Sequence, residues 1–267
     1  MRILVLMPVR DAPEAATLAA LRDNADGATL TVFTETGLPV DIARNRLAAR
    51  ARAVLHAHDL VLWVDADAWW PKGTFTHIAT RMRRLKERDL LASFHCARRA
   101  YAPVNGSMIG PDGAPALPAI PIIRAAPDWL LPVTFAGSHF YAHRPALLAI
   151  LDHTPFSLLP VSAGEDGAFC RRVILGGGTI YIDGRLAVFH VENGVGFLPG
   201  RGPFRFDGTN MIALGQAPPN SPEEMKHAPF RRYGETVDEA RRGLFARNGV
   251  TEEEVISKSA DPPKPVD

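Results

Sequence analysis

The stretch Asp59-Leu-Val-Leu-Trp-Val-Asp-Ala-Asp-Ala-Trp-Trp70 joins a continuous apolar run to two carboxylates. The run at residues 60–64 is typical of a strand that is buried on both faces of a sheet. Asp65 and Asp67 follow it at positions i and i+2, so we expect them side by side at the sheet's rim. Carboxylates so placed repel each other unless a cation or hydrogen-bond donors compensate them. A hard divalent ion with open positions for phosphate oxygens is one compensation, and capping of the following turn is the alternative.

Apolar and amphipathic segments alternate before this strand. Apolar runs at residues 3–7 and 28–33 predict two more strands, and residues 13–22 and 41–55 predict helices. Strands that alternate with helices form a sheet covered on both faces. We therefore expect an α/β, Rossmann-like fold with a mostly parallel central sheet, helices on both faces and a small antiparallel region. In such folds ligands bind at the carboxyl ends of the strands.

The predicted helix at residues 41–55 has two kinds of surface. Asp41 is expected to cap it, and Ala43, Leu47 and Ala51 share its apolar face. Arg44 and three further arginines are expected on the other face. A row of charges of this kind is usually a solvated helix face.

The second half of the chain is less regular. A Gly- and Pro-rich stretch at residues 102–123 is interpreted as a hairpin or a long loop. Further strands are expected at residues 90–96, 134–143, 179–183 and 186–191, and further helices at 76–88, 144–151 and 165–175. We place an α/β domain at residues 1–215 and a C-terminal extension, with one helix and a disordered tail, at residues 216–267.

Composition excludes several classes of protein. The 267 residues are 46% hydrophobic and carry a formal net charge of only +1, so no global field favours nucleic acid or an anionic membrane. No apolar run reaches the roughly 18 residues of a membrane-spanning helix, and two cysteines are too few for a disulfide framework. A cytoplasmic protein without a transmembrane segment is the simplest interpretation.

Two further sites carry residues that could do chemistry. Glu165 and Asp166 begin a predicted helix, where they either cap it or supply a general base. His190 ends the apolar run at residues 186–190, where it is either structural or a metal ligand.

Taken in order, these pieces resemble glycosyltransferases of the GT-A fold, close to family 2 and to the Anp1-like mannosyltransferases. The resemblance covers roughly residues 2–195 and depends on several short motifs in order rather than on one. The matching segments are Leu6-Met-Pro-Val-Arg10, Ile42-Ala-Arg-Asn-Arg-Leu47, Leu62-Trp-Val-Asp-Ala-Asp67, Ala136-Gly-Ser-His-Phe-Tyr141, Gly164-Glu-Asp166 and Phe189-His190.

The resemblance implies a nucleotide site in the first part of the chain. Glu35 matches the acidic residue that ends the second strand. Arg44 and Asn45 match the helix that faces the nucleotide, although Arg44 is alternatively a surface charge. The residues that match the loop holding the base are Pro8, Val9 and Arg10.

The resemblance also implies a metal site. Asp65 would contact ribose or metal, and Asp67 would bind Mn²⁺ or Mg²⁺ bridging the diphosphate. His190 would close the metal site from the far end of the domain. Gly137 and Ser138 match the segment that lines the donor-sugar pocket.

A protein of this class moves a sugar from a UDP- or GDP-sugar to a hydroxyl of a saccharide, lipid, protein or modified nucleobase. Family 2 enzymes are generally inverting, and there Asp166 would be the base, with Glu165 as its neighbour or substitute. Anp1-like enzymes are retaining, and there both residues would bind sugar hydroxyls. A homodimer is compatible with this resemblance.

Two other functions remain open. A sugar nucleotidyltransferase has a similar sheet, but its first loop is Gly-rich and basic, whereas residues 8–13 here contain no glycine. A non-catalytic module that binds a nucleotide-sugar or carbohydrate is the other, because a fold alone never proves activity.

Overall fold

The computed structural model describes residues 1–94, 108–109, 115–116, 130–137, 140–159, 164–198 and 202–214. The predicted helix and tail at residues 216–267, and Ser138, lie outside the described residues. Within the stretch 102–123, β6 (Met108–Ile109) and β7 (Pro115–Ala116) pair antiparallel, as a hairpin requires. Within the described parts of the chain, no helix is both long and apolar enough to cross a membrane.

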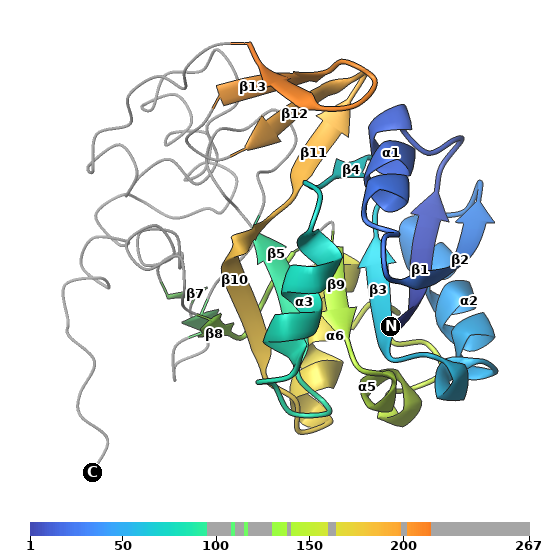
Figure 1. The fold of residues 1–267 in the computed structure, drawn as a ribbon. Helices are drawn as coiled ribbons and strands as arrows, with labels where there is room; N and C mark the ends of the chain where they lie inside the picture. The colour runs from blue at the N-terminus through green and yellow to red at the C-terminus, as the bar shows by residue number, and fades with distance from the viewer. Residues whose placement is uncertain are drawn as a thin grey trace, which may run out of the picture.

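In the described parts of the chain, seven strands form the central sheet (Figure 1). In spatial order they are β2 (Thr29–Thr36), β1 (Arg2–Val9), β3 (Leu60–Val64), β9 (Phe140–His143), β5 (Leu90–Phe94), β10 (Ile180–Ala187) and β8 (Leu130–Val133). The pairs β1–β2, β1–β3 and β5–β10 are parallel. The pairs β3–β9, β5–β9 and β8–β10 are antiparallel.

The sheet is therefore mixed, and the expectation of a mostly parallel sheet is corrected. The antiparallel β9 lies between β3 and β5, and all four of its residues are buried. A short apolar run of this kind has the same sequence pattern whichever way the strand runs. The direction of β9 was thus not readable from its residues.

Helices cover both faces of this sheet, as predicted. The core on one face joins Leu4 and Leu6 of β1 to residues of α2 (Val40–Arg52), α5 (Pro145–Ile150) and α6 (Gly164–Leu175). The core on the other face joins Ile3 and Val5 to α1 (Ala15–Asp23) and α3 (Thr74–Met82). The alternation follows from the two-residue period of a strand, which sends successive side chains to opposite faces.

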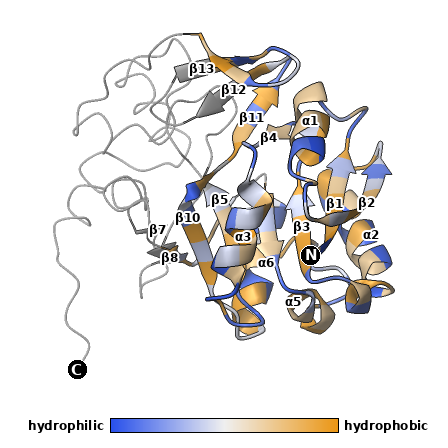
Figure 2. Cartoon of the chain, in the orientation of Figure 1, coloured by the Kyte–Doolittle hydropathy of each residue, from blue (hydrophilic) through white to orange (hydrophobic). Residues whose placement is uncertain are grey.

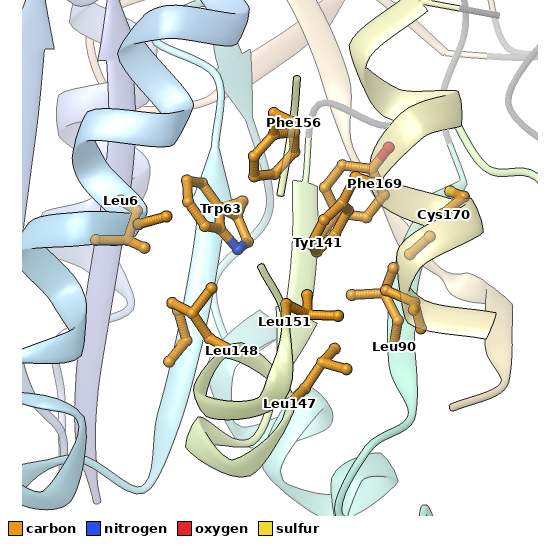
Figure 3. Packing of buried hydrophobic residues seen from close by; sticks show 14 of the residues in the cluster. Leu6, Trp63, Leu90, Tyr141, Leu147, Leu148, Leu151, Phe156, Phe169 and Cys170 are labelled. Atoms are coloured by element: carbon orange, nitrogen blue, oxygen red, sulfur yellow. The ribbon is translucent and has the colours of Figure 1, made fainter. Parts of the chain in front are cut away.

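The first of these cores is rich in aromatic rings (Figure 3). Trp63 of β3 packs edge-on against Phe156 at a centroid distance of 4.7 Å, and Phe156 stacks on Phe169 of α6 at 4.4 Å. Tyr141 of β9 also contacts Phe169. Figure 2 shows hydrophobic colour along β3, as its complete burial requires. These rings attach α6 to the sheet and so fix the start of that helix.

A second, antiparallel sheet has five strands, in the order β14 (Met211–Ala213), β13 (Gly202–Phe206), β12 (Val195–Leu198), β11 (Phe189–Glu192) and β4 (Ala68–Trp69). It is more extensive than the small antiparallel region expected from the sequence. Asn193 and Gly194, with φ of 52° and 74°, form the turn between β11 and β12. Both positive φ values fit the two-residue hairpin turn that Asn-Gly favours.

Candidate functional site

A cavity of about 890 Å³ opens at the carboxyl ends of β1 and β3. Its walls come from residues 8–12 and 14 after β1, 38–40 at the start of α2, and 65–67 after β3. Arg44, Phe135, Gly137, Glu165, Asp166 and residues 191–193 complete the described lining. The cavity lies where the strand order and the βα loops place ligands in α/β sheets.

Arg44 lies at the inner wall of this cavity and is almost fully buried, with 3% of its side chain exposed. Its Nη2 donates to Oδ1 of Asp65 at 2.8 Å. Its Nη1 donates to Oδ1 of Asp166 at 2.7 Å and to Oε1 of Glu165 at 3.4 Å. The expectation that Arg44 belongs to a solvated face is therefore wrong, because the period of α2 places it on the same side as the buried Ala48 and Ala51.

Asp67 lies beside Asp65 but has a different partner. Oδ2 of Asp67 is 3.0 Å from Nε2 of His190, and the two are 29% and 2% exposed. The pairing of β4 with β11 causes this contact, because it places Ala68 opposite His190. The backbone N–H of Val191 also donates to the carbonyl of Asp67 at 2.7 Å. Two of the three residues that the resemblance assigned to the metal site, Asp67 and His190, therefore lie in contact, whereas Asp65 pairs with Arg44.

Glu165 and Asp166 lie in the first turn of α6 and line the same cavity. Burial raises the pKa of Asp166, and the nearby carboxylates of Asp65 and Glu165 raise it further. The charge of Arg44 acts in the opposite direction. A carboxylate with a raised pKa has a higher proton affinity, which suits a general base.

The cavity is strongly acidic. Among the described residues, seven carboxylate side chains and two arginines, Arg10 and Arg44, line it, and Arg44 already pairs with three of the seven carboxylates. The seven are Asp11, Glu14, Asp65, Asp67, Glu165, Asp166 and Glu192. A diphosphate entering this cavity alone would meet net repulsion, whereas a hard divalent cation would be attracted.

The donor set fits a divalent cation in part. Among the described residues, no group of three or more His, Cys, Asp or Glu side chains is arranged to hold a metal ion. The 3.0 Å spacing of Asp67 and His190 equals the separation of two adjacent ligands in an octahedron with bonds of about 2.1 Å. Mg²⁺ and Mn²⁺ are commonly bound by few protein ligands, with water and phosphate oxygens filling the remaining positions.

The other residues assigned from the sequence fall into two groups. Pro8, Val9, Arg10 and Gly137 line the cavity. Glu35 instead accepts a 2.7 Å hydrogen bond from Arg50, and it is absent from the described lining.

Asn45 is likewise absent from the described part of the lining. It bonds to the backbone N–H of Phe156 at 2.8 Å and to Oγ of Ser157 at 3.1 Å. Its side chain therefore fixes the loop that carries Phe156 beneath the site.

Part of the acidic lining, and the buried contacts that Tyr141 and Cys170 make with Ala136, were not predicted from the sequence. Asp11 belongs to the loop after the first strand, where the strand ends already predict a site, but the resemblance gives no role to Asp11, Glu14 or Glu192. Tyr141 donates to the carbonyl of Ala136 at 2.5 Å and thereby holds the backbone next to Gly137. Cys170, whose pKa burial raises to about 12, contacts the same residue.

Comparison with known proteins supports the fold. No protein-family model and no curated protein matches the sequence. The crystal structure of A197 from STIV matches 81% of this chain and 99% of that chain, with a TM-score of 0.56 and 13% identity.

A second structure is more distant. A Bacillus anthracis protein assigned as a glucose-1-phosphate thymidylyltransferase, in complex with a sucrose, matches 66% of each chain with a TM-score of 0.34 and 10% identity. The first match shows that this α/β arrangement recurs in a solved structure.

Proposed function

We propose that this chain is a metal-dependent glycosyltransferase of the GT-A type, which moves a sugar from a UDP- or GDP-sugar to an acceptor hydroxyl. The observation that carries the proposal is the pair Asp67–His190 beside an acidic cavity at the carboxyl ends of the strands. Because carboxylates dominate this cavity, a nucleoside diphosphate needs a cation to bind there. Five of the six short resemblance segments contribute residues to the described lining of this cavity, and His190 of the sixth contacts Asp67.

The residues have distinct roles in this proposal. Asp67 binds the divalent ion, and His190 is its second ligand or orients its carboxylate. The ion, when bound, neutralises the charge that develops on the leaving diphosphate. Pro8, Val9 and Arg10 form the wall on which the base lies, and Gly137 leaves space for the donor sugar.

The acceptor hydroxyl approaches from the side of Glu165 and Asp166. In an inverting reaction, Asp166 accepts the proton of that hydroxyl as the hydroxyl attacks the anomeric carbon. In a retaining reaction, the same carboxylates bind sugar hydroxyls. Both alternatives keep Asp166 in the cavity, and the configuration of the product distinguishes them.

A nucleotide-binding experiment tests the proposal. The thermal shift of the purified chain is measured with UDP, GDP, UDP-sugars and GDP-sugars, each with and without Mn²⁺. We expect a shift with one nucleotide series that requires Mn²⁺ and is lost in Asp67→Ala. Lys72→Ala, which removes an exposed ion pair with Asp26, is the control and should retain the shift.

Turnover is then measured as slow release of nucleoside diphosphate from the sugar donor. Release that requires Mn²⁺ supports a transferase. Binding without any release indicates a binding module, and release of pyrophosphate from a nucleoside triphosphate and a sugar phosphate indicates a nucleotidyltransferase. A shift of equal size without metal would contradict the assignment of Asp67.

A further inference from the structure

Arg44 connects two parts of the site that are far apart in the sequence. Asp65 follows β3 on the side of the cavity assigned to the donor, and Asp166 starts α6 on the side assigned to the acceptor. The two amino groups of one guanidinium bond to these two carboxylates, at 2.8 Å and 2.7 Å.

The geometry requires an arginine rather than any cation. A guanidinium presents separate N–H groups in a rigid plane, so it can hold two carboxylates at a fixed separation. A lysine ammonium is a single point charge on a flexible chain and does not impose such a separation. The guanidinium also lies over the ring of Phe156, 5.2 Å from its centroid, which restricts its position further.

The charges around Arg44 also indicate that this side chain holds the neighbouring carboxylates in place. Asp65, Asp166 and Glu165 lie around one cation that is 3% exposed. Without that cation the three carboxylates would repel one another in a partly buried site and move apart. Arg44 therefore determines where the acceptor-side carboxylate lies relative to the donor-side carboxylate.

We propose that Arg44 is a positioning residue that sets the alignment of the acceptor with the donor by bridging Asp65 and Asp166. This inference rests on the proposed glycosyl transfer and adds a determinant of its rate. A misplacement of about 1 Å between reacting groups can lower a rate by about 100-fold. The effect belongs mainly to kcat, because the cation and the wall formed by residues 8–10 still bind the donor.

The test compares Arg44→Lys and Arg44→Gln with the wild type in a transfer assay with saturating Mn²⁺. We expect kcat to fall about 100-fold in Arg44→Gln, while KM for the donor changes less than about threefold. Arg44→Lys, which keeps the charge but not the planar bridge, should recover only a small part of the loss.

A matched control separates positioning from stability. Arg81 is also buried and bonds to a buried carboxylate, Asp183, at 2.8 Å, and it is absent from the described cavity lining. Arg81→Gln should lower Tm in the same way as Arg44→Gln but leave kcat within about threefold, since it does not touch the reacting groups. Equal kcat values for the two variants would overturn the proposal.

A double-mutant cycle tests the partner directly. If Arg44 acts by placing Asp166, Arg44→Gln should reduce kcat much less in an Asp166→Asn background than in the wild type. Fully additive effects would overturn the proposal, as would an Arg44→Gln variant with unchanged kcat. A wild type that shows neither transfer nor Mn²⁺-dependent nucleotide binding would overturn the proposed function itself, and this inference with it.

Discussion

Oδ2 of Asp67 lies 3.0 Å from Nε2 of His190, and a strand pairing outside the central sheet produces this contact. Asp65 and Asp67 follow β3 at the rim of the central sheet, and the chain then continues into β4. β4 pairs with β11, which carries His190 in its second position. The second sheet is therefore part of the site's construction and not only an addition to the fold.

We expect His190→Gln to weaken Mn²⁺ binding by about 10- to 100-fold, which is the usual effect of losing a ligand's partner at a metal site. Mn²⁺ affinity is measured by electron paramagnetic resonance in the presence of the nucleotide that binds. The control is His77→Gln, because His77 also bonds to a carboxylate, Asp183 at 2.7 Å, and is absent from the described cavity lining. Equal Mn²⁺ affinity in both variants would contradict the assignment of His190.

We expect Asp166→Asn to reduce transfer by about 100- to 10,000-fold if Asp166 is a general base, because an amide cannot accept the proton. Nucleotide affinity with Mn²⁺ should stay within a few-fold of the wild type. The measurement is kcat with saturating donor, combined with the anomeric configuration of the product.

A retained configuration together with a modest loss in Asp166→Asn would contradict the role of base. It would favour the alternative in which Asp166 binds a sugar hydroxyl. Glu165→Gln is the companion variant, because it shows whether the neighbouring carboxylate substitutes for Asp166.

We expect Gly137→Ala to be well tolerated and Gly137→Leu to weaken donor binding. A Cβ at this position would lie 3.4 Å from Cζ of Phe135 and 3.8 Å from Oδ2 of Asp166, which is ordinary contact. A longer side chain would occupy part of the cavity that Gly137 lines. KM for the donor should therefore rise in Gly137→Leu, with little change in Tm.

If Gly137→Ala alone abolishes binding, the donor comes closer to the backbone than this prediction assumes. If Gly137→Leu leaves KM for the donor unchanged, the sugar lies elsewhere in the cavity.

We expect acid to destabilise the fold through His143. Burial lowers the pKa of this histidine to about 4 from an ordinary value of 6.5. Its Nε2 accepts a 3.1 Å hydrogen bond from Nε1 of Trp63, and its Nδ1 is 2.7 Å from the carbonyl of Arg144. The folded state therefore holds a neutral ring with one nitrogen as acceptor and the other as donor.

As the pH falls, His143 is protonated in the unfolded chain before it is protonated in the folded one. The contribution of neutral His143 to the free energy of unfolding is fully present above pH 6.5. It is lost as the pH falls from 6.5 to about 4, and the total loss is about 3 kcal/mol. In His143→Gln, the free energy of unfolding should change less between pH 6.5 and pH 4 than in the wild type. It is measured by unfolding in urea at several pH values. His56→Gln, at an exposed position, is the control and should follow the wild type.

Local sequence patterns determined much of this molecule. The continuous apolar runs at residues 3–7 and 60–64 became β1 and β3, because a strand covered on both faces buries successive side chains on alternate sides. The helix predicted at residues 165–175 became α6, and the expected position of Asp65 and Asp67 after a buried strand was found. The Asn193-Gly194 pair also carried a hairpin signal, which would have predicted the β11–β12 turn.

Tertiary structure alone decided how the charges meet. The direction of β9 and the partners of Arg44 depend on segments that are remote in the sequence, and no local period encodes them. The helical period could have placed Arg44 beside Ala48 and Ala51, but a buried arginine is stable only where carboxylates from other elements surround it. A chain's periodicity fixes which face of an element is covered, whereas the folded arrangement fixes which charges lie against that face.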